Sequence, residues 1–276
     1  MTEGEIRPPE VLEEIPDHAS ETREQLTRHE LGRITLLRHG QTKYTEQYPD
    51  LTTEGQETIR RSAEQIAASL NPDNEAVAMF RSEAVRAAGT ADIIKSGIGH
   101  DDEVRVRPSL NPMIQHDPEQ ARQVFEELLA ANQAAEAQAQ KTGSFPMLDK
   151  SYLTDPRFEN AEIYEPRSNV EHRLFRNIEY AIRAFEVVAK HPELKRPHLI
   201  GVSHYELLGQ LANRVFGLLE NDAQTLKHGE PLDIRVLSTE DPEHPSVDPI
   251  ELEVSFRGQT KTVLFDRKTR DIVIPK

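Results

Sequence analysis

Short apolar, β-rich runs alternate with segments of helical periodicity between residues 33 and 219, and this alternation restricts the fold more than any other feature. The runs typical of strands cover 33–37, 76–80, 104–106 and 198–202. Apolar residues at helical spacing follow at about 53–70, 82–97, 168–190 and 205–219. Alternating strands and helices form a largely parallel sheet with helices on both faces. The sequence therefore predicts a three-layer α/β/α sandwich with a mostly parallel sheet.

Three regions depart from the alternation. Residues 1–30 are acidic, contain three prolines and show little apolar periodicity, so we expect a tail ahead of a main domain at 31–220. Residues 111–167 form an insert with a long helix at about 118–141, which is compatible with a cap over the carboxyl end of the sheet or with a surface helix beside an ordered loop. Residues 221–276 are expected to be a β-rich extension.

The extension alternates in the manner of strands at 250–256, 260–265 and 272–274, with turn residues between these runs. The pattern predicts a C-terminal antiparallel β-meander. Three arrangements suit it: extension of the main sheet, coverage of another surface, or pairing with a second chain.

Composition excludes several functions. The chain has no cysteine, so disulfides, thiolate metal sites and a cysteine nucleophile are ruled out. No secretory signal pattern or membrane-length apolar run is present, so we expect a cytoplasmic protein without a membrane partner. The formal charge of −15 disfavours nucleic acid as a partner, and it requires a local group of cations if the ligand is an anion.

Such cations follow the expected strands. Arg38 and His39 come after the first strand, Ser82 and Arg86 after the second, and Ser203-His204 after the fourth. Ligands of open α/β sheets bind at the carboxyl ends of the strands, so these side chains are expected to meet in one pocket. Two arginines and two histidines suit a phosphoryl group. Ser82 is also a candidate helix cap.

Four ordered motifs at these positions resemble the histidine phosphatase superfamily, the phosphoglycerate mutase-like family. They are Arg-His-Gly-Gln-Thr at 38–42, Leu-Thr-Thr-Glu-Gly at 51–55, the run Ser-Glu-Ala-Val-Arg-Ala-Ala-Gly-Thr-Ala at 82–91, and Val-Ser-His at 202–204. The resemblance extends over about 33–219 and implies the α/β fold predicted above.

The resemblance implies that His39 is the nucleophile and forms a phosphohistidine, with one ring nitrogen held by a carbonyl near Gly40. Arg38, Arg86 and His204 would bind the phosphoryl oxygens. Water would then release phosphate without a metal ion or other cofactor. The implied substrate is a phosphorylated small molecule or a phosphoprotein.

One departure concerns the general acid. Members commonly carry a Leu-x-Glu motif after the third strand, whereas this chain has proline at position 112, which cannot donate a proton. Asp117 or Glu206 could supply the proton instead, or the substrate could have a good leaving group such as that of an anhydride.

Two further departures weigh against a phosphoglycerate mutase. Thr45 stands where mutase-type members have a phosphate-contacting asparagine, and Tyr205 replaces the glycine after the second histidine. Tyr205 either shapes the leaving-group side of the pocket or only begins the next helix. The remaining histidines, including His198, lack metal-ligand spacing and are expected to face solvent.

These observations predict a metal-independent phosphatase acting on a phosphomonoester or phosphoanhydride. A mutase-type phosphoryl transferase is one alternative. A non-catalytic phosphate-binding or regulatory module on the same fold is the other. The sequence defines no oligomeric state.

Overall fold

The computed structural model describes residues 28–43, 50–142, 147–219, 225–239 and 250–275, and these contain one eight-stranded mixed sheet and a small two-stranded sheet. The strand order of the large sheet is β10-β9-β8-β7-β1-β6-β4-β5. Its strands are β1 (Arg28–Arg38), β4 (Glu75–Arg81), β5 (Arg105–Val106), β6 (Arg196–Ser203), β7 (Pro231–Thr239), β8 (Ile250–Phe256), β9 (Gln259–Asp266) and β10 (Asp271–Val273). The small sheet pairs β2 (Thr42–Lys43) with β3 (Asp50–Leu51).

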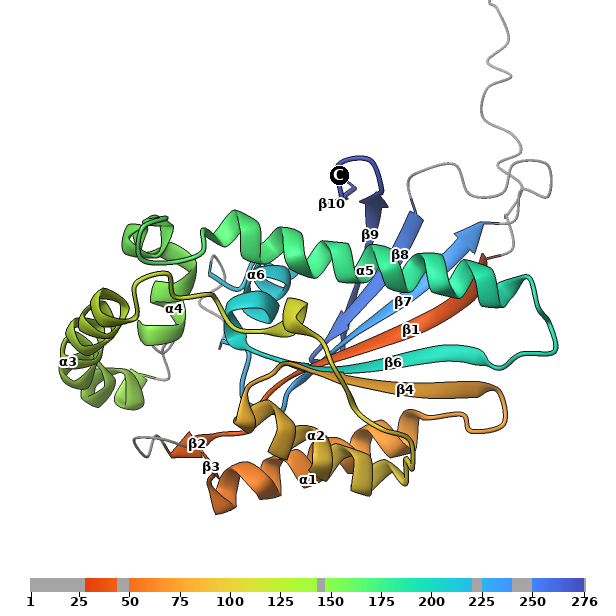
Figure 1. The fold of residues 1–276 in the computed structure, drawn as a ribbon, viewed down its shortest axis with the longest axis horizontal. Coiled ribbons are helices and arrows are strands. Elements are labelled where there is room, and N and C mark those ends of the chain that lie inside the picture. The colour runs from red at the N-terminus through yellow and green to blue at the C-terminus, as the bar shows by residue number, and fades with distance from the viewer. Residues whose placement is uncertain (1–27, 44–49, 143–146, 220–224, 240–249, 276) are drawn as a thin grey trace, which may run out of the picture.

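Helices cover both faces of the large sheet, as Figure 1 shows: α1 and α2 lie on one face, and α5 and α6 on the other. The helices are α1 (Thr53–Ser69), α2 (Val85–Ile98), α3 (Pro118–Thr142), α4 (Met147–Thr154), α5 (Arg167–Ala189) and α6 (Tyr205–Phe216), with short 3-10 helices η1 (Pro108–Leu110) and η2 (Pro156–Glu159). The predicted three-layer sandwich is confirmed. Across the described ranges, no helix has the length and apolar character needed to cross a membrane.

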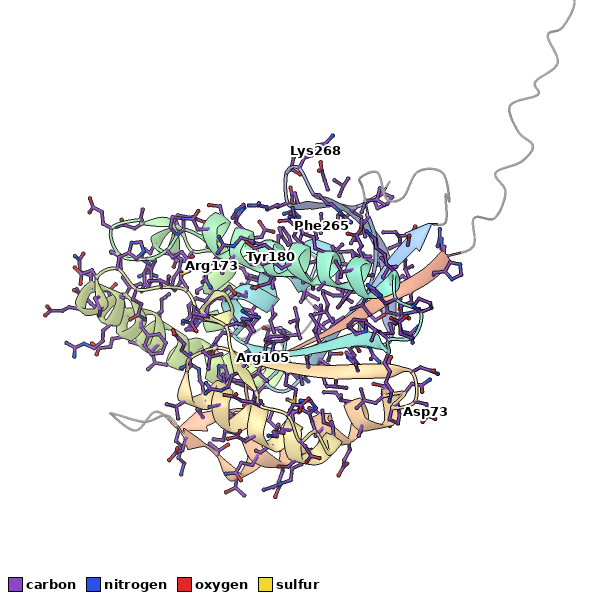
Figure 2. The ribbon with its side chains drawn as sticks, turned by 45° about the vertical axis from the view of Figure 1, so that its right-hand side comes forward. Asp73, Arg105, Arg173, Tyr180, Phe265 and Lys268 are labelled. Atoms are coloured by element: carbon purple, nitrogen blue, oxygen red, sulfur yellow. The ribbon has the colours of Figure 1, made fainter. Side chains whose placement is uncertain are left out.

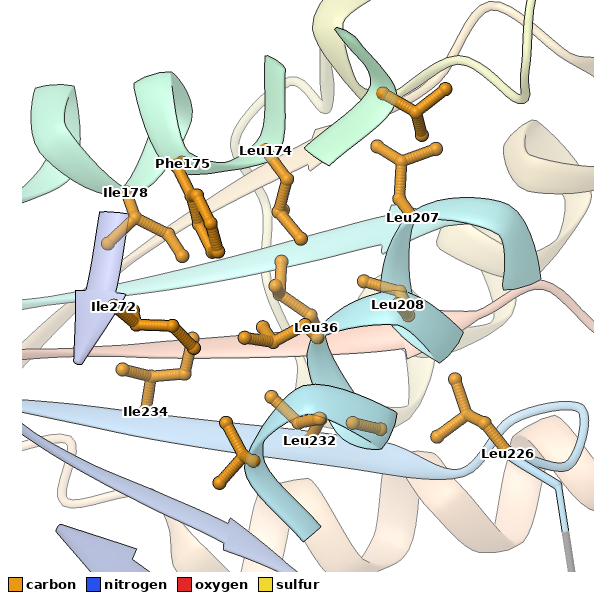
Figure 3. Close-up of a cluster of buried hydrophobic side chains, with 14 of the residues drawn as sticks. Leu36, Leu174, Phe175, Ile178, Leu207, Leu208, Leu226, Leu232, Ile234 and Ile272 are labelled. Atoms are coloured by element: carbon orange, nitrogen blue, oxygen red, sulfur yellow. The ribbon is translucent and has the colours of Figure 1, made fainter. Parts of the chain in front are cut away.

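The core forms on both sides of β1 because successive residues of a strand point to opposite faces. Leu36 belongs to the apolar cluster under α5 and α6, whereas its neighbour Leu37 belongs to the cluster under α1 and α2. Figure 3 shows Leu174, Phe175 and Ile178 of α5 directed from above onto the strands that include Leu36. The strand is therefore buried on both faces.

The parallel strands end at the same edge of the sheet. β1 pairs with β6 as far as Arg38 opposite Ser203, and β4 pairs with β6 as far as Arg81 opposite Val202. The residues that follow these three strands therefore start from neighbouring positions.

The insert lies on the side toward which the parallel strands run (Figure 1). It has a buried hydrogen bond of its own: the Tyr164 hydroxyl donates to the carbonyl of Ala121 at 2.9 Å, and both residues are buried. The ring of Tyr152 on α4 lies 6.4 Å from that of Tyr205 on α6. This position is compatible with a cap over the carboxyl end, which stays a prediction.

The C-terminal meander extends the main sheet, which decides among the three arrangements considered above. β7 pairs antiparallel with β1, and β8, β9 and β10 follow in sequence. The turn between β8 and β9 places Arg257 and Gly258 at φ values of 49° and 73°, as a type I′ hairpin turn requires.

One boundary and one strand differ from those expected from the sequence. β1 begins at Arg28, so the last three residues of the expected tail are strand, while 1–27 lie outside the described residues. The strand β7 was not predicted, although Leu232, Ile234 and Val236 alternate with polar residues and are fully buried. Its alternation is the signal that would have identified it.

The prediction that His198 faces solvent is wrong. Its side chain is completely buried on the central strand β6, where its Nε2 lies 2.8 Å from the Thr35 hydroxyl. The Glu75 carboxylate lies 3.6 Å from Nδ1. Burial, with the nearby Arg33 guanidinium, lowers the pKa of His198. The residue is a partnered polar group of the core.

Candidate active site

Backbone hydrogen bonds continue past the ends of the parallel strands. The amide of His39 donates to the carbonyl of Ser203 at 3.0 Å, and the amide of Ser82 donates to the carbonyl of Val202 at 3.1 Å. Because β6 lies between β1 and β4, these bonds hold the segments after all three strands side by side. His39, Ser82 and His204 are thereby gathered at one edge of the sheet.

The His39 ring is held in one tautomer. Nδ1 lies 2.8 Å from the carbonyl of Gly40, which can only accept, so Nδ1 carries the proton and Nε2 keeps its lone pair. The amide of Gly40 in turn donates to the Thr90 hydroxyl at 2.9 Å. The Arg86 Nε donates to Nε2 at 3.0 Å. The expectation of a carbonyl near Gly40 thus agrees with the geometry, and Nε2 faces a cation.

His204 is held from two sides. Arg86 Nη2 lies 3.1 Å from Nδ1, and because a guanidinium only donates, Nδ1 is the acceptor. Nε2 then carries the proton and donates to the Ser82 hydroxyl at 2.7 Å. Both His204 and Ser82 are fully buried. Ser82 therefore orients His204, and the interpretation of Ser82 as the cap of α2 is wrong, because the N-cap residue is Ala84.

Arg38 and Tyr205 form a second part of the site. The Arg38 guanidinium stacks over the Tyr205 ring at 4.9 Å from its centre and donates from Nη1 to the carbonyl of Leu226 at 2.7 Å. Tyr205 is buried and is the first residue of α6. It therefore both begins the helix and packs against the Arg38 guanidinium. A Cβ on Gly209 would lie 2.8 Å from the Tyr205 ring, so the glycine makes room for it.

A third histidine, which sequence reasoning missed, lies beside the nucleophile candidate. The ring centre of His228 is 5.4 Å from that of His39, and the His204 ring centre is 5.0 Å from His39. His228 precedes β7, whose first residue, Pro231, pairs with Leu37 near the carboxyl end of β1. Recognition of β7 would have placed its preceding loop at the same edge as His39. We call His39, His204 and His228 the pocket histidines.

All three pocket histidines are neutral at neutral pH. Burial, followed by the Arg86 guanidinium, holds the pKa of His39 well below its usual value. Burial and the neighbouring His39 and Arg86 do the same to the pKa of His204. Burial, Arg38 and Arg86 lower the pKa of His228 to about 3. The pocket thus combines two permanent cations with unprotonated imidazoles, which favours an anionic ligand.

The two carboxylates expected as proton donors differ in their surroundings. Asp117 is half-buried at the start of α3 and accepts from the amides of Glu119 and Gln120. Hydrogen bonds from the Gln120 backbone and side chain lower the pKa of Asp117, which is opposite to what a general acid needs. Glu206 is half-buried in the first turn of α6. Thr45, predicted to contact phosphate, lies outside the described residues.

The segment with proline in place of glutamate is fixed close to the pocket. Ser203 Oγ donates to the carbonyl of Leu110 at 2.9 Å. The Asn111 side chain accepts from the amide of Glu83 at 2.8 Å and donates to the Glu83 carboxylate at 2.5 Å. Glu83, next to Ser82, is therefore a carboxylate near the site that sequence reasoning did not single out.

Arg173 on α5, labelled in Figure 2, also holds this segment. It donates to the carbonyls of Ser109, Asn111 and Pro112 at 3.0–3.2 Å. It also makes two bonds of 2.7 Å to the carboxylate of Glu165. Both side chains of this pair are largely buried, so the segment at 109–112 is anchored by an internal ion pair.

An α/β/α sandwich that gathers arginines and histidines at the carboxyl ends of its parallel strands is suited to an anionic phosphoryl group. The sequence model of the histidine phosphatase superfamily (branch 1) matches residues 34–248, and the chain belongs to that superfamily. The resemblance drawn from the four motifs is thus confirmed. No match is found among curated proteins.

Solved structures with similar folds include phosphatases and a mutase. A mycobacterial glucosyl-3-phosphoglycerate phosphatase is 18% identical over 82% of this chain and 98% of its own, with a TM-score of 0.47. A phosphoglycerate mutase from Bacillus anthracis is 16% identical over 76% and 92%, with a TM-score of 0.46. A putative alpha-ribazole-5'-P phosphatase from Escherichia coli is 20% identical over 79% and 99%, with a TM-score of 0.44.

Proposed function

We propose that the chain is a metal-independent phosphatase that hydrolyses a phosphomonoester or phosphoanhydride through a phosphohistidine on His39. One observation carries the proposal: the His39 ring is held by the Gly40 carbonyl so that an unprotonated Nε2 faces the Arg86 guanidinium. Membership of the histidine phosphatase superfamily supports the same chemistry. The substrate class is a phosphorylated small molecule or a phosphoprotein.

In this proposal Nε2 of His39 attacks phosphorus while the oxygens of the phosphoryl group bind to Arg38, Arg86 and His204. Arg86 is the central donor because its Nε and Nη2 already lie against Nε2 of His39 and Nδ1 of His204. Charge-assisted hydrogen bonds of this kind contribute about 1.5–3 kcal/mol each. The arginines supply the positive charge for the in-line transition state, and water then cleaves the phosphohistidine.

The neutral state of His39 is part of the proposal. A protonated imidazole has no lone pair for attack, and the lowered pKa keeps the ring unprotonated at neutral pH. The positive charge of the arginines in the pocket is also opposite in sign to the formal charge of the whole molecule, which is −15. The substrate is thereby attracted to one location on an acidic protein.

The test is hydrolysis of p-nitrophenyl phosphate in the presence of EDTA by the wild type and by His39→Ala. The matched control is His191→Gln, because the His191 side chain is exposed and its one ion pair among the described residues is with Glu193 at 3.3 Å. We expect phosphate release by the wild type and the control, and loss of at least ~10³-fold in His39→Ala. Alkaline quenching of the wild type should trap an acid-labile phosphoenzyme.

Four outcomes would overturn the proposal in different ways. Retained turnover in His39→Ala would show that His39 is not the nucleophile. Turnover that disappears when EDTA is added would show that the reaction needs a metal ion. Binding of phosphate without turnover, with Pro112 in place of the expected acid, favours the phosphate-binding module. Transfer between hydroxyls of one substrate, without release of phosphate, favours the mutase.

A further inference from the structure

The proposed reaction lacks an evident proton donor, although a leaving alkoxide needs one. Pro112 cannot donate, and Asp117 is bound to the amides of the first turn of α3, with hydrogen bonds that lower its pKa. General acid catalysis typically contributes ~10²–10⁴-fold to the rate. A group that supplies the proton must lie beside the phosphoryl group and carry an N–H or O–H at the moment of bond cleavage.

His228 lies in the right place. Its ring centre is 5.4 Å from that of His39, with the two planes inclined at 59°. The rings of His204 and His228 both pack near the His39 ring, at 5.0 and 5.4 Å. In the described part of the chain, no residue forms a hydrogen bond with the His228 ring, so its nitrogens are available to a ligand.

The loop that carries His228 is fixed to the framework of the site. The Gly229 amide donates to the carbonyl of Arg38 at 2.8 Å, and the Gly229 carbonyl accepts from the Ser62 hydroxyl at 2.6 Å. The carbonyl of Leu226 accepts from the Arg38 guanidinium at 2.7 Å. Gly229 has φ = 73°, a left-handed conformation that favours glycine. The backbone on both sides of His228 is thus held against the end of β1.

The charge around His228 depends on the ligand. Arg38, Arg86 and the neutral imidazole of His39 lie near the ring, and burial together with the two arginines lowers the pKa of His228 to about 3. A phosphate dianion bound to these arginines offsets their charge and adds negative charge near the ring. Its arrival therefore favours the protonated form of His228.

We propose that His228 is the general acid of the reaction, in place of the glutamate that this chain lacks. The inference rests on the proposed function. As His39 Nε2 forms its bond to phosphorus, the bond from phosphorus to the leaving oxygen breaks, and the leaving oxygen takes the proton of the His228 imidazolium. Neutral His228 then accepts a proton from the water that attacks the phosphohistidine, which restores His228 to the protonated state while phosphate is bound.

The leaving group provides the test. kcat/KM is measured for p-nitrophenyl phosphate, whose leaving group needs little protonation, and for an alkyl phosphate, whose leaving group needs a proton. We expect His228→Gln to lose ~10²-fold or more on the alkyl ester and less than ~10-fold on the nitrophenyl ester. His191→Gln should lose nothing on either substrate, because the His191 side chain is exposed and pairs with Glu193 at the surface.

Glu83→Gln tests the competing donor. Asn111 holds the Glu83 carboxylate next to Ser82, so the variant removes one carboxylate close to the pocket. Glu206→Gln removes the half-buried carboxylate in the first turn of α6 and is measured in the same way. The inference predicts equal effects on the two esters for each of these variants. It is overturned if Glu83→Gln or Glu206→Gln shows the selective loss on the alkyl ester, or if His228→Gln loses activity equally on both esters or not at all.

Chemical rescue covers the case in which a substitution disturbs the loop. Added imidazole should restore alkyl-ester turnover to His228→Ala and leave Glu83→Gln and His39→Ala without rescue on that ester. Absence of rescue in a His228→Ala protein with wild-type circular dichroism counts against the donor role. Failure of the wild type to show His39-dependent turnover would instead remove the proposed function itself.

Discussion

Replacement of Arg173 by methionine should destabilise the protein by about 3–5 kcal/mol, the usual cost of leaving a buried charge without its partner. The side chains of Arg173 and Glu165 are 13% and 8% exposed, and two bonds of 2.7 Å join them. The substitution also removes the donor to three carbonyls of the segment at 109–112. Because this segment contacts Ser203 through Leu110, we expect a lower kcat/KM as well.

Urea unfolding followed by far-UV circular dichroism measures the effect, with the free energy taken from the midpoint and the slope. The double variant Arg173→Met with Glu165→Gln also removes the buried negative charge of Glu165. Its free energy of unfolding should be at least ~2 kcal/mol higher than that of the single variant. The argument is refuted if the single variant loses less than ~1 kcal/mol, or if the double variant is no more stable than the single one.

Three further predictions concern the pocket and its supports. Because the pocket histidines have lowered pKa values, the folded state binds fewer protons than the unfolded state. The free energy of unfolding should therefore be constant above pH ~6.5 and fall below that pH by up to ~1.4 kcal/mol per pH unit for each ring. Urea titrations between pH 7.5 and 5 measure this change, and a flat profile would contradict it. Gly55→Ala should cost about 1–3 kcal/mol in urea unfolding, because a Cβ there meets the carbonyl of Gln41, and an unchanged midpoint would contradict the reasoning. Ser82→Ala leaves the Nε2 proton of His204 without an acceptor and should lower kcat/KM for p-nitrophenyl phosphate ~10-fold, whereas an unchanged rate would show that Ser82 does not orient the ring.

The sequence predicted the elements whose periodicity is strong. The α/β/α sandwich, the parallel strands and the last three strands of the meander follow from local patterns of apolar residues. The attachment of the meander to β1 was not predictable, since it depends on which strand edge is free once the sheet has formed. His198 was misjudged for a related reason: its burial depends on the position of β6 at the centre of the sheet.

The site was predictable where motifs follow parallel strands. Arg38, His39, Arg86 and His204 meet because the register of β1, β4 and β6 brings strand ends together. His228 was not predicted because its loop leads into an antiparallel strand, β7. The amino end of β7 lies at the same sheet edge as the carboxyl ends of the parallel strands. Asp117 directly precedes the helix predicted at about 118–141, so its hydrogen bonds to the amides of Glu119 and Gln120 follow from a helix start that the sequence did predict.

The position of β1 also has a consequence for biosynthesis. Both of its neighbours in the sheet, β6 and β7, begin beyond residue 195, so the strand that leads into His39 leaves the ribosome long before either partner exists. Pairings between distant parts of a chain form slowly and leave apolar surface exposed in the meantime. A nascent chain therefore carries His39 early but can assemble the site only after β6 and β7 have been made, so chaperone binding during translation should centre on β1.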